Sequence, residues 1–347
     1  MKSRHRVNST LALLPKLRLL ALLRRCDPKM SFKLPLISDA ADYRLHFNDG
    51  IWQQAVATIC ARHGIPYERL RRSPQGENII FFVDEDFVVK VFAPFRDNYL
   101  RETAALAFAQ GKLSIKTPHL MHTGEIDGWS YLVMTRLAGQ ASREVWTSVG
   151  RRDRLEIVSR LGLAISELHK YAAPLQTALD RDWRGFIERQ AQTSVDCQRA
   201  CGANPEWLAS LPAYIDARLA LLPTDYEPVF LHGDIHAGNL LLMEVDGHWQ
   251  IGGLIDFGDS LCGFNEYEFV APGVLMVQGD GELQKALLLA YGYTEAQLNL
   301  HLRARLMLLT ILYECSDLRK YALRLAPEAI YLTLEELERA IWTFATE

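Results

Sequence analysis

Three oxygen-bearing side chains, those of Asp234, Asn239 and Asp256, lie within one strand-rich stretch of the sequence, residues 229–257. The amide oxygen of Asn239 and the carboxylate of Asp256 are hard ligands that suit Mg²⁺ better than a soft metal would. Asp234 precedes Asn239 by five residues and adds a carboxylate that can accept a proton. A proton-accepting carboxylate beside two oxygen ligands for magnesium is what phosphoryl transfer to a hydroxyl requires.

A turn signal within this stretch indicates how the three side chains come together. Asp246-Gly247 separates two apolar runs and predicts a β-hairpin. Asn239 and Asp256 are about equally far from this turn along the chain, to within about one residue. In a hairpin, residues at equal distances from the turn lie opposite each other. We therefore expect Asp256 to return to the level of Asn239 at the open end of the hairpin, with Asp234 on the loop that enters it.

The first part of the chain has the pattern of a small sheet with one or two helices. Apolar spacing predicts a short helix over residues 51–64 and a second from Asp97 or Asn98 to residue 110. The predicted strands are residues 78–83, 87–92 and 129–134, the first two joined by a hairpin turn. We expect residues 30–136 to form an N-terminal lobe.

Helical spacing dominates from residue 140 onward. The predicted helices are residues 155–171, 182–197, 208–222, 282–291, 295–325 and 334–344. A chain of 347 residues suggests two lobes at roughly 150 residues per domain. The sequence therefore predicts an α+β, two-lobe fold, in which a small β-rich N-lobe precedes a larger helical C-lobe, residues 137–347, with the hairpin embedded in it.

The motif H-G-D-x-x-x-x-N at residues 232–239, followed by I-D-F-G-D at residues 255–259, resembles that of the aminoglycoside phosphotransferase and choline kinase family. The resemblance implies an enzyme with a protein-kinase-like fold, in which H-G-D stands where protein kinases have H-R-D. Carried over by position, Asp234 is the catalytic base, His232 supports the loop, and Asn239 and Asp256 bind Mg²⁺. Family members often continue with G-D-P-x-Y-D-L-A, and Glu268 stands here at the position of the second Asp.

Two charged residues of the first lobe fit the same expectation. Lys90 is the only charged residue of the predicted strand 87–92. Its alternative role is that of a lysine on an edge strand, which prevents another chain from pairing with the sheet. Glu102 points toward the apolar face of its helix, where a carboxylate needs a partner. We predict that Lys90 pairs with Glu102, and the resemblance implies that this pair serves the α- and β-phosphates of ATP or GTP.

The remaining nucleotide contacts are predicted from position. Neither G-x-G-x-x-G nor G-x-x-x-x-G-K-[ST] occurs, so the Rossmann and P-loop interpretations fail. Ser73, Gly76 and Asn78 lie at the turn before the first strand and are predicted to present backbone N–H groups to the phosphates. The residues from Thr135 to Leu137 are predicted to form a hinge that meets the purine through main-chain groups.

These features predict an ATP- and Mg²⁺-dependent enzyme that phosphorylates a hydroxyl of a small molecule. The net charge of −4 argues against a general nucleic-acid binder. Residues 227–347 carry seven Lys or Arg and eighteen Asp or Glu, an excess of negative charge that would attract a cationic acceptor. The resemblance implies an aminoglycoside-type antibiotic as acceptor, and with it antibiotic resistance, while a choline-like amino-alcohol, a sugar or another metabolite stays open.

Two other classes of protein stay open as well. A metallophosphoesterase also uses Gly-Asp-Ile-His, although the other His- and Asp-containing elements of that class do not occur in the sequence. A non-catalytic nucleotide-binding module would keep the same polar groups. His236 either stabilises its loop or contacts the substrate, and His169 is expected to pack on a helix. The side chains that either line an acceptor pocket or belong to an aromatic core are those of Trp183, Trp207, Tyr313 and Glu314.

Residues 1–29 differ from the rest, with eight Lys or Arg and one Asp. Their leucine-rich run is too short to span a bilayer and has no signal-peptide pattern. We expect a basic extension outside the folded lobes, either lying on a membrane or partner surface or preceding a natural start at Met30. The six cysteines show no zinc spacing, which favours a reduced, cytoplasmic protein. The oligomeric state is not predicted.

Overall fold

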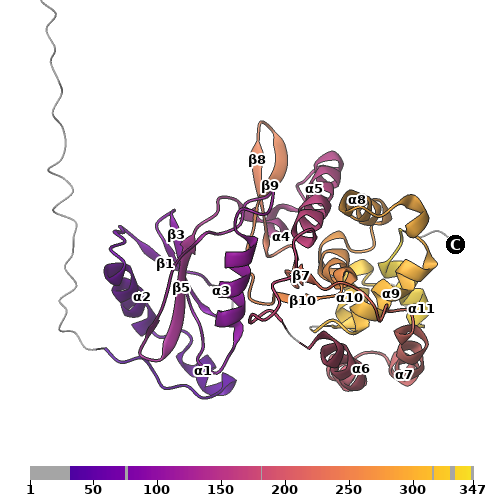
Figure 1. Ribbon diagram of the computed structural model, residues 1–347, viewed down its shortest axis with the longest axis horizontal. Coiled ribbons are helices and arrows are strands. Elements are labelled where there is room, and N and C mark those ends of the chain that lie inside the picture. The colour runs from indigo at the N-terminus through magenta and orange to yellow at the C-terminus, as the bar shows by residue number, and fades with distance from the viewer. Residues whose placement is uncertain (1–31, 75–76, 181, 315, 329–332, 345–347) are drawn as a thin grey trace, which may run out of the picture.

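The computed structural model describes residues 32–74, 77–180, 182–314, 316–328 and 333–344. Over these residues, a β-sheet with three helices forms the N-terminal part, and helices with two small sheets form the C-terminal part (Figure 1). The predictions made for residues 1–29 and for Gly76 concern positions outside the described ranges.

The N-terminal sheet has five antiparallel strands in the order β1-β2-β3-β5-β4. Their bounds are Leu70–Arg72 (β1), Ile79–Val83 (β2), Phe87–Val91 (β3), Leu120–Ile126 (β4) and Trp129–Thr135 (β5). The central strand β3 pairs Lys90 with Ile80 on one side and Leu132 on the other. Because side chains alternate along a strand, Val89 and Val91 face one side of the sheet and Lys90 faces the other.

Three of these strands agree with the predicted ranges, and two have no counterpart in the prediction. The strand β1 has only three residues, two of them arginines. The strand β4 reads Leu-Met-His-Thr-Gly-Glu-Ile and is mostly half-exposed or exposed, so it presents no apolar run. Both strands form because their backbones pair with β2 and β5, which no local pattern shows.

Two helices, α1 (Ala40–His46) and α2 (Ile51–Arg62), belong to the N-terminal part, and α2 lies on the side of the sheet away from the C-terminal part (Figure 1). Trp52 of α2 packs edge-to-face on Trp129 of β5, with 4.6 Å between ring centroids, and both are buried. The helix α1 is additional to those predicted. Asp39 begins it by accepting hydrogen bonds from the N–H groups of Ala41 and Asp42.

The helix α3 (Asn98–Ala109) lies on the other face of the sheet and joins the two parts (Figure 1). Phe108 of α3 stacks on Phe230 of β7 (Val229–Leu231), with 4.9 Å between ring centroids. Buried residues of the sheet such as Val88 and Leu132 belong to the same hydrophobic cluster as Phe230. This cluster therefore spans both lobes, while a second cluster that includes Trp52 and Trp129 lies within the N-terminal part.

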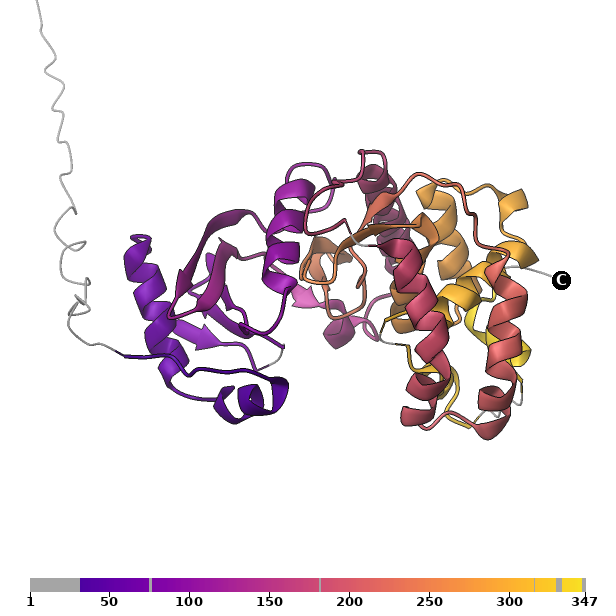
Figure 2. The same ribbon diagram turned by 60° about the horizontal axis from the view of Figure 1, so that its bottom comes forward.

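The C-terminal part is mainly helical. Its helices are α4 (Ser142–Val145), α5 (Arg151–His169), α6 (Trp183–Ala200), α7 (Pro205–Leu219), η1 (Asn265–Phe269), η2 (Pro272–Val277), α8 (Gly281–Tyr291), η3 (Glu295–Gln297), α9 (Leu300–Ile311), α10 (Leu318–Leu325) and α11 (Leu334–Ile341). The helices α6 and α7 lie side by side at the edge of this part (Figure 1 and Figure 2). The residues from Leu306 to Leu309 in α9 are buried and belong to the hydrophobic core.

The predicted hairpin is present as β8 (Leu240–Val245) and β9 (His248–Leu254). Asp246 and Gly247 both have positive φ, 53° and 79°, as a two-residue turn of the type common in hairpins requires. A bulge between Leu241 and Leu242 shifts the register by one residue. The short strand β6 (Gln140–Ala141) pairs with β8, and β7 pairs separately with β10 (Leu261–Gly263).

The prediction of one long helix over residues 295–325 is wrong, because this stretch forms η3, α9 and α10. The side chain of Asn299 accepts hydrogen bonds from two backbone N–H groups and begins α9. The side chain of Asp317 accepts one from Lys320 and begins α10. The helical spacing of apolar residues continues across both helix ends, so only these caps show where the helices stop. The turn between α9 and α10 contains Tyr313.

The close packing of α5 against α8 predicts a specific sensitivity at Gly162. A Cβ atom at this position would overlap the carbonyl oxygen of Leu287 on α8. We expect Gly162→Ala to lower the free energy of unfolding by about 1–3 kcal/mol, as overpacking does elsewhere. Urea titration followed by circular dichroism measures this. Gly50→Ala is the control, because nothing lies within 4 Å of a Cβ there; equal stability of the two variants would contradict the predicted overlap.

Candidate active site

The Lys90 ammonium lies between two carboxylates that come from different lobes. Its Nζ is 2.6 Å from Oε2 of Glu102 on α3 and 2.8 Å from Oδ1 of Asp256, which follows β9. The side chains of Lys90 and Glu102 are 3% and 1% exposed. The predicted Lys90–Glu102 ion pair is therefore present, and a second carboxylate joins it across the lobe boundary.

The electrostatics of this cluster keep Lys90 and Asp256 charged. Burial alone would lower the pKa of Lys90, but the negative charges of Asp256 and Glu102 outweigh this effect and raise it. The positive charge of Lys90 in turn holds the pKa of Asp256 below its ordinary value. Removing Lys90 would leave the buried carboxylate of Glu102 without its partner.

The Asp234 carboxylate is held at both oxygens. The Tyr313 hydroxyl is 3.1 Å from Oδ1 and also donates to the carbonyl oxygen of Gly233 at 2.9 Å. The Nδ2 amide of Asn239 donates to Oδ2 at 3.1 Å and to the main-chain oxygen of Asp234 at 3.0 Å. Tyr313, which the sequence placed only in an acceptor pocket or a core, therefore contacts the predicted catalytic base directly.

His232 supports the loop from within, as predicted. It is completely buried, and its Nε2 lies 3.2 Å from the carbonyl oxygen of Ile255. Its Nδ1 accepts a hydrogen bond from the N–H of Asp234 at 3.3 Å. Burial lowers the pKa of His232, so the ring is neutral and bridges the Asp234 loop and the strand end before Asp256.

Glu268 holds the same loop through its backbone. Its Oε2 accepts a hydrogen bond from the N–H of His232 at 2.7 Å, and its Oε1 accepts one from the N–H of Gly233 at 3.0 Å. His169 of α5 lies on the other side of Glu268, with Nε2 3.7 Å from Oε2. The sequence comparison gave Glu268 no role beyond standing where family members have an Asp. Its contacts show that the longer side chain reaches two backbone donors.

The glycine of H-G-D is required by geometry. Gly233 has φ of +81°, and a Cβ atom there would lie 2.6 Å from the carbonyl oxygen of Asp259. Any other residue at position 233 would have a strained backbone, and its Cβ atom would overlap the carbonyl oxygen of Asp259. Asp256 also has a positive φ, 64°, which turns the chain sharply after β9 and brings its carboxylate to Lys90.

The environment of Asp234 favours its protonated form. Burial raises the pKa of Asp234 to about 7, and the negative charges of Asp259 and Asp256 act in the same direction. The hydrogen bonds from Tyr313 and Asn239 oppose this shift because they stabilise the ionised form. A carboxylate with a pKa near neutrality is suited to accept a proton at physiological pH.

Asn239 and Asp256 meet at the open end of the hairpin, as predicted. The N–H of Ile255 donates to the main-chain oxygen of Asn239 at 2.9 Å, which places Asp256 one residue beyond. The Nδ2 of Asn239 is used by Asp234, and its Oδ1 has no hydrogen bond to a described residue. An unused amide oxygen beside a carboxylate fits Mg²⁺, which takes one or two protein ligands and completes its shell with phosphates and water.

The described residues contain no group of three or more His, Cys, Asp and Glu side chains that could hold a metal ion. A magnesium site here would therefore consist of the amide oxygen of Asn239 and the carboxylate of Asp256, with the remaining ligands supplied by the nucleotide and water.

The predicted phosphate turn lies before β2. Asn78 is 5% exposed, and its Oδ1 is buried without a hydrogen bond to a described residue. The N–H of Ser73 donates to the carbonyl oxygen of Ile80 at 2.9 Å, so this N–H belongs to the sheet pairing. The backbone donor expected from Ser73 is therefore already used within the sheet.

The predicted hinge is also partly used by the fold. The N–H of Thr135 donates to the carbonyl oxygen of His119 at 2.9 Å, and its Oγ1 accepts from the N–H of His119. The N–H of Arg136 donates to Asp86. Thr135 is thus the last residue of β5 and has no free main-chain N–H, whereas Leu137 makes no such bond to a described residue.

Aromatic residues pack next to Tyr313. Tyr267 packs on Tyr313 with 5.4 Å between ring centroids, and Trp183 packs edge-to-face on Tyr267 at 5.2 Å. The next residue, Glu314, is exposed. Trp207, in contrast, is 5% exposed and belongs to the large hydrophobic core.

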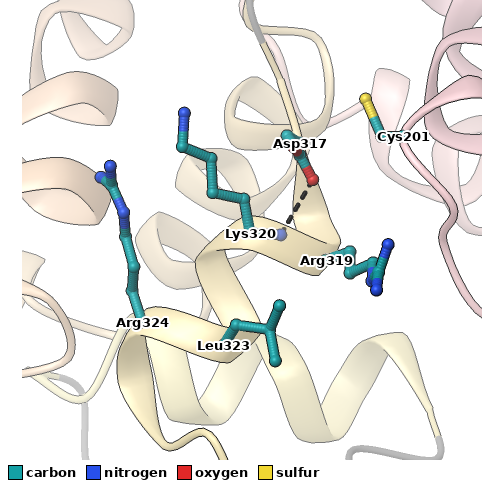
Figure 3. Close-up of a pocket in the computed structure, with 6 residues that line it drawn as sticks. All are labelled: Cys201, Asp317, Arg319, Lys320, Leu323 and Arg324. Atoms are coloured by element: carbon teal, nitrogen blue, oxygen red, sulfur yellow. Dashed lines mark hydrogen bonds between the residues drawn. The ribbon is translucent and has the colours of Figure 1, made fainter.

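Two surface cavities lie apart from these residues. One of about 340 Å³ is bordered by the basic side chains of α10 and by Cys201 (Figure 3). The other, of about 620 Å³, is lined by His169, Glu266 and Arg305 among others. Neither cavity is lined by a predicted catalytic or nucleotide-binding residue. The candidate site is therefore defined by the hydrogen bonds and ion pairs around Asp234 and Lys90.

The model of the phosphotransferase enzyme family matches residues 70–302. The chain belongs to that family. It is 28% identical over 160 residues to an aminoglycoside 3′-phosphotransferase of Niallia circulans, a match that spans 45% of this chain and 56% of the relative. The chain thus matches a little over half the length of this curated relative.

The fold of this phosphotransferase family member is similar to solved structures. One is the GDP complex of wild-type aminoglycoside 2′-phosphotransferase-IIIa, with a TM-score of 0.63 and 17% identity over 82% of this chain and 98% of that chain. Another is an ADP-bound aminoglycoside phosphotransferase, with a TM-score of 0.57 and 18% identity over 82% of this chain and 98% of that chain. The predicted α+β, protein-kinase-like fold is confirmed, and the family model confirms the predicted resemblance. Among the described residues no helix is long and apolar enough to cross a membrane.

The contacts of Asp234 predict its titration in the protein without nucleotide. We expect its carboxyl group to titrate near pH 7, protonated below this value and ionised above it. Tyr313→Phe removes a hydrogen bond that stabilises the ionised form, so the midpoint should rise by roughly one pH unit. Carbon-13 NMR of the aspartate carboxyl groups measures both, with Asp234→Asn to assign the signal. A wild-type midpoint near the ordinary aspartate value would contradict this expectation.

The contacts of Glu268 predict a structural loss from a small change. Glu268→Gln replaces one acceptor oxygen by an N–H donor that faces a backbone N–H. We expect the loop to be destabilised by about 1–3 kcal/mol, the penalty for a buried donor without a partner. Amide hydrogen exchange at His232 and Gly233 should accelerate accordingly. Glu244→Gln, on the exposed end of β8, is the control; unchanged exchange in Glu268→Gln would show that its two hydrogen bonds do not hold the loop.

Proposed function

We propose that this protein transfers the γ-phosphoryl group of ATP or GTP to a hydroxyl of a small cationic molecule of the aminoglycoside type. The observation that carries the proposal is a chain of contacts through the hairpin end. Asn239 donates a hydrogen bond to Asp234 at 3.1 Å, the N–H of Ile255 donates to the main-chain oxygen of Asn239 at 2.9 Å, and the next residue, Asp256, pairs with Lys90 of the sheet at 2.8 Å. Family membership supports the same chemistry.

In this proposal Asp234 is the catalytic base. It accepts the proton of the acceptor hydroxyl as the hydroxyl oxygen attacks the γ-phosphorus atom, and the bond from that atom to the β/γ bridging oxygen breaks to release ADP or GDP. Tyr313 and Asn239 hold its carboxylate, and His232 supports the loop through main-chain contacts. Positioning of this kind can supply about 7–11 kcal/mol of the barrier reduction.

Lys90 and the hairpin end serve the nucleotide. Lys90, oriented by Glu102, would neutralise charge on the α- and β-phosphates. Asn239 and Asp256 would hold Mg²⁺, which would supply positive charge to neutralise the phosphates. Asn78 and Leu137 are the remaining nucleotide contacts that we propose, because Asn78 has an unused buried oxygen and Leu137 an unused main-chain N–H.

This division assigns the nucleotide to residues 30–136 and the acceptor and the catalytic groups to residues 137–347. A cationic acceptor is supported by the exposed carboxylate of Glu314, which is adjacent in sequence to Tyr313, and by the negative charge of residues 227–347. The aminoglycoside 3′-phosphotransferase relative supports the aminoglycoside class. We propose a cytoplasmic location because the reaction draws on the nucleotide pool.

The proposal is tested by phosphorylation of a panel of hydroxylated acceptors, with aminoglycosides first, then choline-like amino-alcohols and sugars. ADP or GDP release and a mass increase of one phosphoryl group on the acceptor report the reaction. We expect Asp234→Asn to lower kcat by roughly 10²–10⁴-fold, the usual contribution of a positioned base.

Asp216→Asn is the matched control, because Asp216 is exposed on α7. Wild-type turnover in Asp234→Asn would show that the base is misassigned. Nucleotide binding without phosphorylation of any acceptor would favour a non-catalytic module, and phosphorylation of choline-like compounds or sugars alone would replace the aminoglycoside assignment.

A further inference from the structure

His236 lies in the middle of the loop that carries Asp234 and Asn239, and the proposed mechanism gives it no role. Its ring Nδ1 accepts a hydrogen bond from the N–H of Gly238 at 2.8 Å. Its ring Nε2 lies 3.4 Å from Oδ2 of Asp234. One ring thus contacts the backbone of the loop on one side and the carboxylate of Asp234 on the other.

These contacts determine which ring nitrogen carries the proton. A nitrogen that accepts a hydrogen bond must be unprotonated, so Nδ1 of His236 is bare and the proton of the neutral ring is on Nε2. Burial lowers the pKa of His236, which agrees with a neutral ring. The Nε2–H is therefore on the ring nitrogen that lies nearest the Asp234 carboxylate, 3.4 Å from Oδ2.

Backbone hydrogen bonds and a glycine define the surroundings of the His236 ring. The N–H of Asn239 donates to the carbonyl oxygen of His236 at 2.9 Å, and the N–H of Arg143 donates to that of Ala237 at 2.8 Å. A Cβ atom on Gly238 would lie 2.6 Å from Cε1 of the His236 ring, so the ring packs directly against the glycine. The absence of a side chain at this position leaves room for the ring beside its hydrogen-bond donor.

Two polar groups lie near Oδ2 of Asp234. The Nδ2 amide of Asn239 donates a hydrogen bond to it at 3.1 Å, and Nε2 of His236 lies 3.4 Å away. The His236 side chain is 28% exposed and that of Asp234 23% exposed, so both reach the surface where the acceptor would approach.

We propose that His236 is a positioning residue for the catalytic base. Its Nε2–H directs Oδ2 of Asp234, while the Nδ1 contact with Gly238 sets the ring orientation. This inference rests on the proposed function, because Asp234 is the base only in that reaction. His236 makes no bond to substrate in this role and acts through the orientation of the carboxylate.

Two amide substitutions separate the two contacts. The oxygen of Asn in His236→Asn can replace Nδ1 and keep the Gly238 hydrogen bond, but the side chain is too short to reach Asp234. The amide nitrogen of Gln in His236→Gln can replace Nε2 and keep the contact with Asp234, but loses the bond to Gly238. We expect His236→Asn to lower kcat roughly three- to tenfold, the loss expected for one polar contact.

The KM values for nucleotide and acceptor should stay unchanged in His236→Asn, and His236→Gln should recover most of the lost kcat. Wild-type kcat in His236→Asn would overturn the proposal. So would the opposite order, in which His236→Gln is impaired and His236→Asn is not, because it would show that His236 only stabilises the turn. A raised KM for the acceptor at unchanged kcat would show a substrate contact instead, and would also overturn it.

A second measurement does not depend on turnover. Long-range ¹H–¹⁵N NMR of the protein without nucleotide or acceptor should show a protonated Nε2 and a bare Nδ1 for His236, identified as the signal lost in His236→Asn. The reverse protonation would overturn the inference. If the wild-type protein phosphorylates no acceptor, the proposed function fails, and the NMR result still decides whether His236 presents a donor to Asp234.

Discussion

The buried ammonium of Lys90 is the interaction on which the rest of the site depends. It comes from the central strand of the N-terminal sheet, and its two carboxylate partners come from α3 and from the end of the hairpin in the C-terminal part. A buried cation of this kind is tolerated only with compensating charge. Glu102 alone would hold Lys90 within its own lobe, whereas Asp256 ties the lobes together where a nucleotide would lie between them.

A second constraint is the need to satisfy the backbone of the loop before Asp234. The N–H groups of His232 and Gly233 are buried, and they are paired by the carboxylate of Glu268. Buried donors without partners are costly, so this contact fixes the loop strongly. The turn after α9 then brings the Tyr313 hydroxyl to Asp234, and the large hydrophobic core positions that turn. Stability and site geometry are therefore linked through the same residues.

Much of the site follows from local pattern, and the departures have physical causes. The Asp246-Gly247 turn and strand pairing were enough to place Asn239 beside Asp256, with one bulge as the only shift. The Lys90–Glu102 pair followed from a charge on a buried strand and a charge on an apolar helix face. The long helix predicted over residues 295–325 was wrong because apolar periodicity continues through the caps that divide it. Thr135 was expected to meet the nucleotide through its main chain, but its N–H is used by the carbonyl oxygen of His119, the residue before β4, and β4 has no local signal.

The amino-acid sequence by itself determined the chemical groups and their local spacing: the carboxylates, the amide, the lysine and the turn that pairs two of them. Only the tertiary structure decided which distant side chains surround Asp234. Tyr313 is 79 residues away along the chain, and Glu268 is 35 or 36 residues from the N–H groups that it holds. Local spacing predicts contacts within a helix or a hairpin, because these have a fixed geometry. Contacts between elements depend on how their buried faces pack, which no short stretch of sequence contains.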